Sequence, residues 1–142
     1  MTPLVKKWVI GAEEDYSVAT RLLRGRKYRA YASVRFHVQQ CAEKYLKALL
    51  QCENTEFPRT HNLVELVHCL SCDQNQFLLL TPQLELLTKA AVQVRYLEVP
   101  STKADAKLDV KIATQVRELA RLALQLDSGK QVKSRRNQRR SI

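Results

Sequence analysis

One stretch of the chain carries an apolar repeat that is regular enough to fix its secondary structure. Between residues 28 and 52, apolar or aromatic side chains recur at alternating steps of three and four residues, at Tyr31, Val34, Val38, Cys41, Tyr45, Ala48 and Cys52. Such spacing places them on one side of an α-helix, as a seam that packs against neighbouring helices at shallow angles. The seam therefore predicts a helix that lies inside a helical bundle.

Four further segments space their apolar side chains by three and four residues, the period of an amphipathic helix. Gly25 follows one of them, and Thr81 with Pro82 begins another as a hydroxyl cap followed by proline. The four segments span residues 4–24, 60–70, 81–99 and about 102–126. The polar stretches 51–59 and 73–76 are predicted to be connections.

The composition agrees with a fold built from helices. The 142 residues include only 3 Gly and 4 Pro, too few to punctuate a strand-turn-strand fold. Hydrophobic residues make up 45% of the chain, which is enough to fill a core and excludes a wholly disordered chain. We therefore predict an all-α domain over residues 1–129, an antiparallel up-and-down four-helix bundle with an additional short helix.

The net charge of +10 is concentrated at the C-terminal end, where residues 130–142 contain no acidic side chain. The basic residues there are Lys130, Lys133, Arg135, Arg136, Arg139 and Arg140. We predict a disordered tail that either binds polyanions weakly or only aids solubility. Because the tail has no aromatic residue to stack on bases, we expect no specific recognition of single strands. The remaining 129 residues carry 18 basic and 14 acidic side chains, a balance of +4 that predicts no strong nucleic-acid face on the bundle.

The sequence favours a cytoplasmic chain without a metal or cofactor. No apolar run reaches the roughly 18 residues of a membrane span, and charged residues interrupt the start of the chain before a signal-peptide core can form. The 4 cysteines are expected to be reduced. Cys69 and Cys72 have the spacing of metal ligands, but no second well-spaced pair accompanies them, so we predict no metal site.

A polar stripe runs along another side of the 28–52 helix. It consists of His37, Gln40, Lys44 and Lys47. The simplest interpretation is the solvated face of a bundle helix. The functional alternative is a nucleotide or anion site in which Lys44 and Lys47, joined by Arg95 through bundle packing, hold a phosphate while Gln40 contacts a base or a partner.

His61 is a further candidate for this anion site. It directly follows Thr60 at a predicted helix start, a position that favours capping or packing over catalysis. Arg95 and Tyr96 stand at the end of a predicted helix, where a cation is favourable to the helix dipole.

Several stretches together resemble the HEPN domain family. They are Trp8, Ala12, Asp15 and Ala19, the segment from Val38 to Leu50, His61-Asn62-Leu63, and Arg95-Tyr96 with Pro100. The most specific is Gln-Gln-x-x-Glu-Lys-x-Leu-Lys-Ala-Leu-Leu at residues 39–50, and the resemblance covers about residues 8–126. It implies a bundle of four to five helices, usually a homodimer, whose bacterial and archaeal members often work beside a small nucleotidyltransferase.

Some members that this sequence resembles are metal-independent ribonucleases, which use an Arg and a His separated by four to six residues. No Arg–His pair here has that spacing, and no histidine follows Arg95. The resemblance therefore favours a non-catalytic binding and dimerisation module, the partner subunit of a small nucleotidyltransferase in a toxin-antitoxin-like system, with nucleotide binding as a secondary property. Two alternatives stay open: a ribonuclease that uses Arg35, His37 and Lys44, and an RNA-binding protein that uses its basic face and tail.

Overall fold

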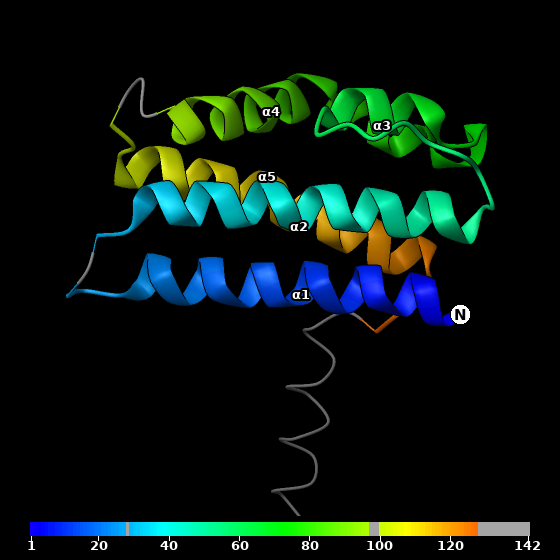
Figure 1. Cartoon of the computed structure of the whole chain (residues 1–142), viewed down its shortest axis with the longest axis horizontal. Helices are drawn as coiled ribbons and strands as arrows, with labels where there is room; N and C mark the ends of the chain where they lie inside the picture. The colour runs from blue at the N-terminus through cyan, green and yellow to red at the C-terminus, as the bar shows by residue number, and fades with distance from the viewer. Residues whose placement is uncertain (28, 97–99, 128–142) are drawn as a thin grey trace, which may run out of the picture.

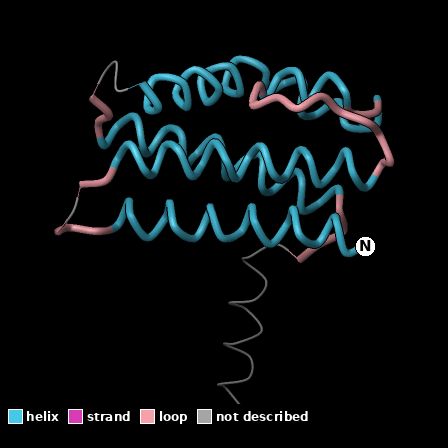
Figure 2. Tube along the Cα trace, in the orientation of Figure 1, coloured by secondary structure: helices cyan, strands magenta, loops and turns pink. Residues whose placement is uncertain are grey.

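A computed structural model describes residues 1–27, 29–96 and 100–127 of the chain. It contains α1 (Pro3–Arg24), α2 (Tyr31–Cys52), α3 (Leu63–Cys69), the 3₁₀ segment η1 (Cys72–Leu80), α4 (Thr81–Tyr96) and α5 (Lys103–Ala123). Over these residues there is no strand (Figure 2), which confirms the all-α prediction. The predicted tail, residues 130–142, and the side chains of Cys72, Arg95 and Tyr96 lie outside the described residues.

Local chemistry sets the helix ends. Thr2 caps α1 by accepting a hydrogen bond from the amide of Val5, and Thr102 and Asp105 form a reciprocal capping box at the start of α5. α5 ends at Ala123, three residues before the predicted end, because the chain turns at Gln125 with a φ of 58°. The predicted connection at 73–76 lies within η1, which consists of two short helical segments joined by a kink at Gln74.

α2 is the central helix of the bundle. Figure 1 shows α1 along one side of it and α3 with α4 along the other, with α5 packed behind. From residue 37 to residue 50 no side chain of α2 is exposed. The interior of the seam is fully buried, at Val34, Val38, Cys41, Tyr45 and Ala48. The prediction that this helix lies inside a bundle is therefore confirmed.

α2 and α5 run parallel to each other. Arg35 bonds to Asp109, and further along both helices Tyr45 bonds to Arg121, so the contacts advance in the same direction. Between the described residues of α1 and α4 there is no contact, and these helices lie on opposite flanks (Figure 1). The bundle is thus flattened, with α2 and α5 as its short diagonal.

None of the helices that the structure describes is long and apolar enough to cross a bilayer.

Replacing the fully buried Leu46 by Ala is expected to lower the free energy of unfolding by about 2–5 kcal/mol, because it leaves a cavity in α2. Leu122 is 72% exposed on α5, so Leu122→Ala is the matched control and should change stability by about 0.5 kcal/mol or less. Urea denaturation followed by circular dichroism measures both. Equal losses in the two variants would contradict the central burial of α2.

Candidate functional site

Asp15 of α1 is the centre of the first polar cluster. It is 8% exposed. One carboxylate oxygen lies 2.8 Å from Nδ1 of His37, and the other accepts a hydrogen bond of 2.6 Å from Nζ of Lys44. The sequence alone predicts that Asp15, in a mostly buried first helix, is either exposed or paired with a base such as Arg95. The structure pairs it with two bases of α2 instead.

Lys44 reaches Asp15 by crossing α1 at Gly11. A Cβ at position 11 would lie 3.2 Å from Cδ of Lys44, closer than ordinary van der Waals contact. A glycine weakens a helix interior, and here its missing side chain leaves room for the stem of Lys44. The close approach of the Lys44 side chain therefore explains the glycine at position 11 of α1.

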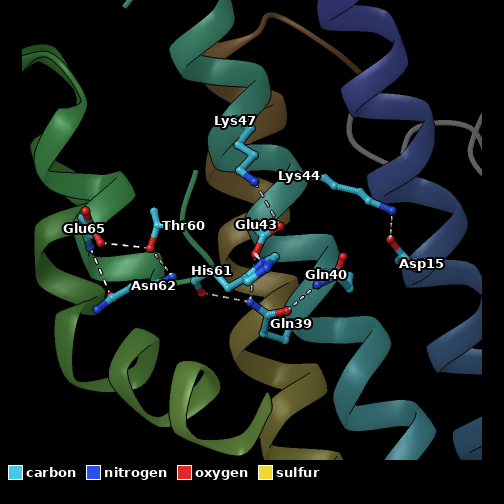
Figure 3. A network of polar contacts seen from close by, with 10 residues as sticks. All are labelled: Asp15, Gln39, Gln40, Glu43, Lys44, Lys47, Thr60, His61, Asn62 and Glu65. Atoms are coloured by element: carbon cyan, nitrogen blue, oxygen red, sulfur yellow. Dashed lines mark hydrogen bonds and ion pairs between the residues drawn. The ribbon is translucent and has the colours of Figure 1, made fainter. Parts of the chain in front are cut away.

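Glu43 of α2 is the centre of the second cluster (Figure 3) and is 4% exposed. Its carboxylate lies 2.8 Å from Nδ1 of His61 and accepts a bond of 3.3 Å from Nζ of Lys47. Gln39 donates to the same carboxylate at 3.4 Å and to the backbone carbonyl of His61 at 3.2 Å, while its own oxygen accepts a 2.8 Å bond from Gln40. These bonds fasten the α2–α3 connection to the middle of α2.

His61 neither caps nor packs. Asn62 caps α3, because its side-chain oxygen accepts bonds from the amides of Val64 and Glu65. The side chain of His61 is 65% exposed, so the interpretation of His61 as a capping or packing residue is wrong. Its ring lies at the surface and is held from below by a buried carboxylate.

The polar stripe is half-buried rather than solvated. His37, Gln40, Lys44 and Lys47 are all of intermediate exposure, because α1 packs along this side of α2. Nζ of Lys47 also lies 5.6 Å from the ring centroid of Trp8 in α1, a cation–π contact. The expectation that Arg95 joins Lys44 and Lys47 falls on a side chain outside the described residues.

A third cluster, which the sequence did not predict, joins three helices at Glu13. Arg117 of α5 donates two bonds to its carboxylate, at 2.7 and 2.8 Å, and Tyr45 of α2 donates one of 2.6 Å. Burial by itself would raise the pKa of Glu13, but the bonds from Arg117 and Tyr45 outweigh it and hold that pKa below its ordinary value. Burial, with the bond to Glu13, raises the pKa of Tyr45.

Arg35 lies apart from His37 and Lys44. Its guanidinium donates to Asp109 at 2.8 Å and to Ser101 at 3.1 Å, on the side of α2 that faces α5. Burial raises the pKa of Asp109 even though Arg35 is bonded to it. Of the three residues proposed for a ribonuclease, the structure therefore brings together only His37 and Lys44, at Asp15.

The described residues form no group of three or more His, Cys, Asp or Glu side chains that could hold a metal ion. Cys41 is buried in the core, where burial raises its pKa and keeps the thiol protonated. A cavity of about 330 Å³ lies between α3 and η1, lined by Val67, His68, Leu70, Ser71, Gln74, Asn75 and Leu78. None of the candidate anion-site residues lines it.

Glu13→Gln is expected to flatten the acid side of the stability profile. A carboxyl group whose pKa is lower in the folded chain contributes stability above its unfolded pKa, near 4.5, and loses it as pH falls through the folded value. The variant should be less stable than wild type at pH 7, and the gap should close below pH 4.5. Unfolding free energies measured from neutral pH down to about pH 2.5 test this. The exposed neighbour Glu14 gives the control, Glu14→Gln, whose profile should parallel wild type; a parallel profile for Glu13→Gln as well would refute the prediction.

Arg35→Met is expected to cost about 3–5 kcal/mol of stability, because it leaves the carboxylate of Asp109 buried without a partner. Adding Asp109→Leu should recover most of that loss, since both polar groups are then replaced by apolar ones. A double-mutant cycle by denaturant unfolding measures the coupling. Additive losses would show that the two side chains do not depend on each other.

Comparison with known proteins assigns the chain to a family. The profile of the HEPN domain matches residues 5–123. The structure is similar to that of TT1696 from Thermus thermophilus, with a TM-score of 0.73 and 21% identity over 84% of this chain and 97% of that one. It is also similar to ST0689, described as an archaeal HEPN homologue, with a TM-score of 0.61 and 27% identity over 82% of this chain and 94% of that one. No curated protein matches the sequence. Because the HEPN profile spans most of its length, this chain belongs to the HEPN domain family.

Proposed function

We propose that this chain is a non-catalytic binding and dimerisation module, which acts as the partner subunit of a small nucleotidyltransferase in a toxin-antitoxin-like pair. The non-catalytic part of the proposal rests on the carboxylate partners of the histidine and arginine side chains. His37 and His61 each bond through Nδ1 to a buried carboxylate, while Arg35 bonds to Asp109 on another side of α2. Among the described side chains, no arginine and histidine share a partner, as a phosphate-binding pair would.

Dimerisation in this proposal uses the flanking helices. The apolar seam of α2 is enclosed by its own bundle, so it offers nothing to a second copy. Ile10 of α1 is 59% exposed, and Leu86 and Val92 of α4 are each 50% exposed. Burying such side chains against another subunit is favourable, so the contact belongs to one of these two outward faces.

Nucleotide binding at Gln40, Lys44, Lys47 and His61 is the secondary part of the proposal. The ammonium groups of Lys44 and Lys47 already have carboxylate partners, at Asp15 and Glu43. A phosphate bound here must share or displace those carboxylates, which weakens its attraction. Assembly with a protein partner therefore ranks above nucleotide binding.

Native mass spectrometry of the protein isolated from its source at natural abundance tests the partner. We expect a heteromeric mass that contains this chain and a small nucleotidyltransferase. A bare homodimer would contradict the partner assignment and leave the dimerisation part intact, whereas a monomer would contradict both.

The non-catalytic part has its own test. Purified chain is expected to leave a labelled RNA intact, because its Arg and His side chains are engaged separately. Cleavage that disappears in His37→Ala and persists in His68→Ala would overturn the proposal. His68 is the suitable control since it is exposed on α3 and lies outside all three polar clusters.

A further inference from the structure

The net charge of the bundle is concentrated in one short segment. From residue 16 to residue 42 the sequence contains no acidic residue, and five basic ones fall within nine positions: Arg21, Arg24, Arg26, Lys27 and Arg29. Residues 1–129 carry 18 basic and 14 acidic side chains, and without these five the balance is 13 to 14, or −1. The overall balance of +4 therefore conceals a cationic surface, which we call the basic turn.

The basic turn is open to solvent. It comprises the last turn of α1 and the connection to α2, at one end of the bundle (Figure 1), and all five side chains are exposed. None of the five forms an ion pair with a carboxylate of the described chain. This sets them apart from Arg35, Lys44, Lys47, Arg117 and Arg121, which are all paired.

The first turns of α5 lie at the same end of the bundle. Tyr16 bonds to Thr114 and Glu13 to Arg117, so α1 and α5 are antiparallel, and the start of α2 lies between the end of α1 and the start of α5 (Figure 1). Lys103 and Lys107 are exposed there.

The acidic side chains on these first turns of α5 do not neutralise the basic turn. Asp105 accepts the amide of Thr102 in the capping box and lies 3.9 Å from Arg35, and Asp109 is buried against Arg35. The start of α2 adds positive potential, because Ala30 offers no side-chain cap to its first amides.

We propose that the basic turn binds nucleic acid through the phosphate backbone, without reading base sequence. Like charges held this close repel one another; the C-terminal dipole of α1 offsets part of this repulsion for Arg21 and Arg24, and a bound polyanion offsets the rest. Four of the five are arginines, whose planar guanidinium groups bind phosphate oxygens through two parallel hydrogen bonds. This surface is separate from the apolar faces and polar clusters on which the proposed function rests.

Two full-length variants of equal charge test the assignment. In the first, Arg24, Arg26, Lys27 and Arg29 are replaced by Gln; in the second, the exposed Lys6, Lys7, Arg59 and Lys89 are replaced by Gln. The probe is a fluorescein-labelled DNA duplex of ~20 base pairs, followed by anisotropy between about 50 and 200 mM KCl. Loss of four phosphate contacts should reduce the slope of log affinity against log salt by about 3.6. The factor by which affinity falls between the two salt concentrations should therefore be roughly 100 times smaller for the first variant than for wild type.

The second variant is expected to keep the wild-type slope. Equal reductions in both variants would mean that net charge alone governs binding and would overturn the proposal. An unchanged slope in the first variant, or no binding by wild type at about 50 mM KCl, would also overturn it. So would equal competition by polyglutamate of matched charge, because that result would assign the surface to acidic protein.

A charge-conserving variant guards against a folding artefact. Arg24→Lys, Arg26→Lys and Arg29→Lys together should keep the wild-type salt slope while weakening binding, because lysine keeps the charge and loses the paired hydrogen bonds. Circular dichroism should show unchanged helix content in every variant, since these side chains are exposed. A flattened slope in the lysine variant would contradict the electrostatic mechanism.

Discussion

The packing of α2 against α1, α4 and α5 is the constraint on which the rest of the structure depends. Its polar side chains between residues 37 and 50 are buried or half-buried, so they are stabilised by partners within the bundle, since an unpaired buried charge is costly. α1 supplies Asp15, and α5 supplies Asp109. The ion pairs therefore fix how the neighbouring helices are placed, whereas the buried apolar side chains of the core supply the favourable burial energy.

A basic residue that holds two helices together is already bonded to a carboxylate. Because its charge is neutralised by that carboxylate, it attracts an anionic ligand only weakly. Arg117 and Glu13 illustrate the point, because two parallel bonds fill the planar edge that would bind a phosphate. Arg35 and His37 likewise bond to different carboxylates, Asp109 and Asp15, on different sides of α2.

The fold could be predicted from the sequence because the helices follow from the regular spacing of apolar side chains by three and four residues. The seam from Tyr31 to Cys52 determines a bundle helix wherever its neighbours lie, and Thr102 with Asp105 caps α5 by local bonds alone. The polar stripe has the same period, but lysine and histidine occur in both solvated and half-buried faces, so spacing cannot distinguish them. Glu13 and Arg117 stand 104 positions apart, and no local pattern could have joined them.

The run of basic residues in the basic turn is visible in the sequence, but its exposure and its lack of carboxylate partners among the described residues appear only in the structure. Charge counted over the sequence treats every lysine and arginine alike, yet those that pair inside the bundle contribute little to the field outside it. Once Arg35, Lys44 and Lys47 are set against Asp109, Asp15 and Glu43, the exposed cations that remain govern what approaches the surface. A polyanion that meets this protein is therefore drawn toward the end of the bundle where α1 turns into α2, and away from the helix faces available for a protein partner.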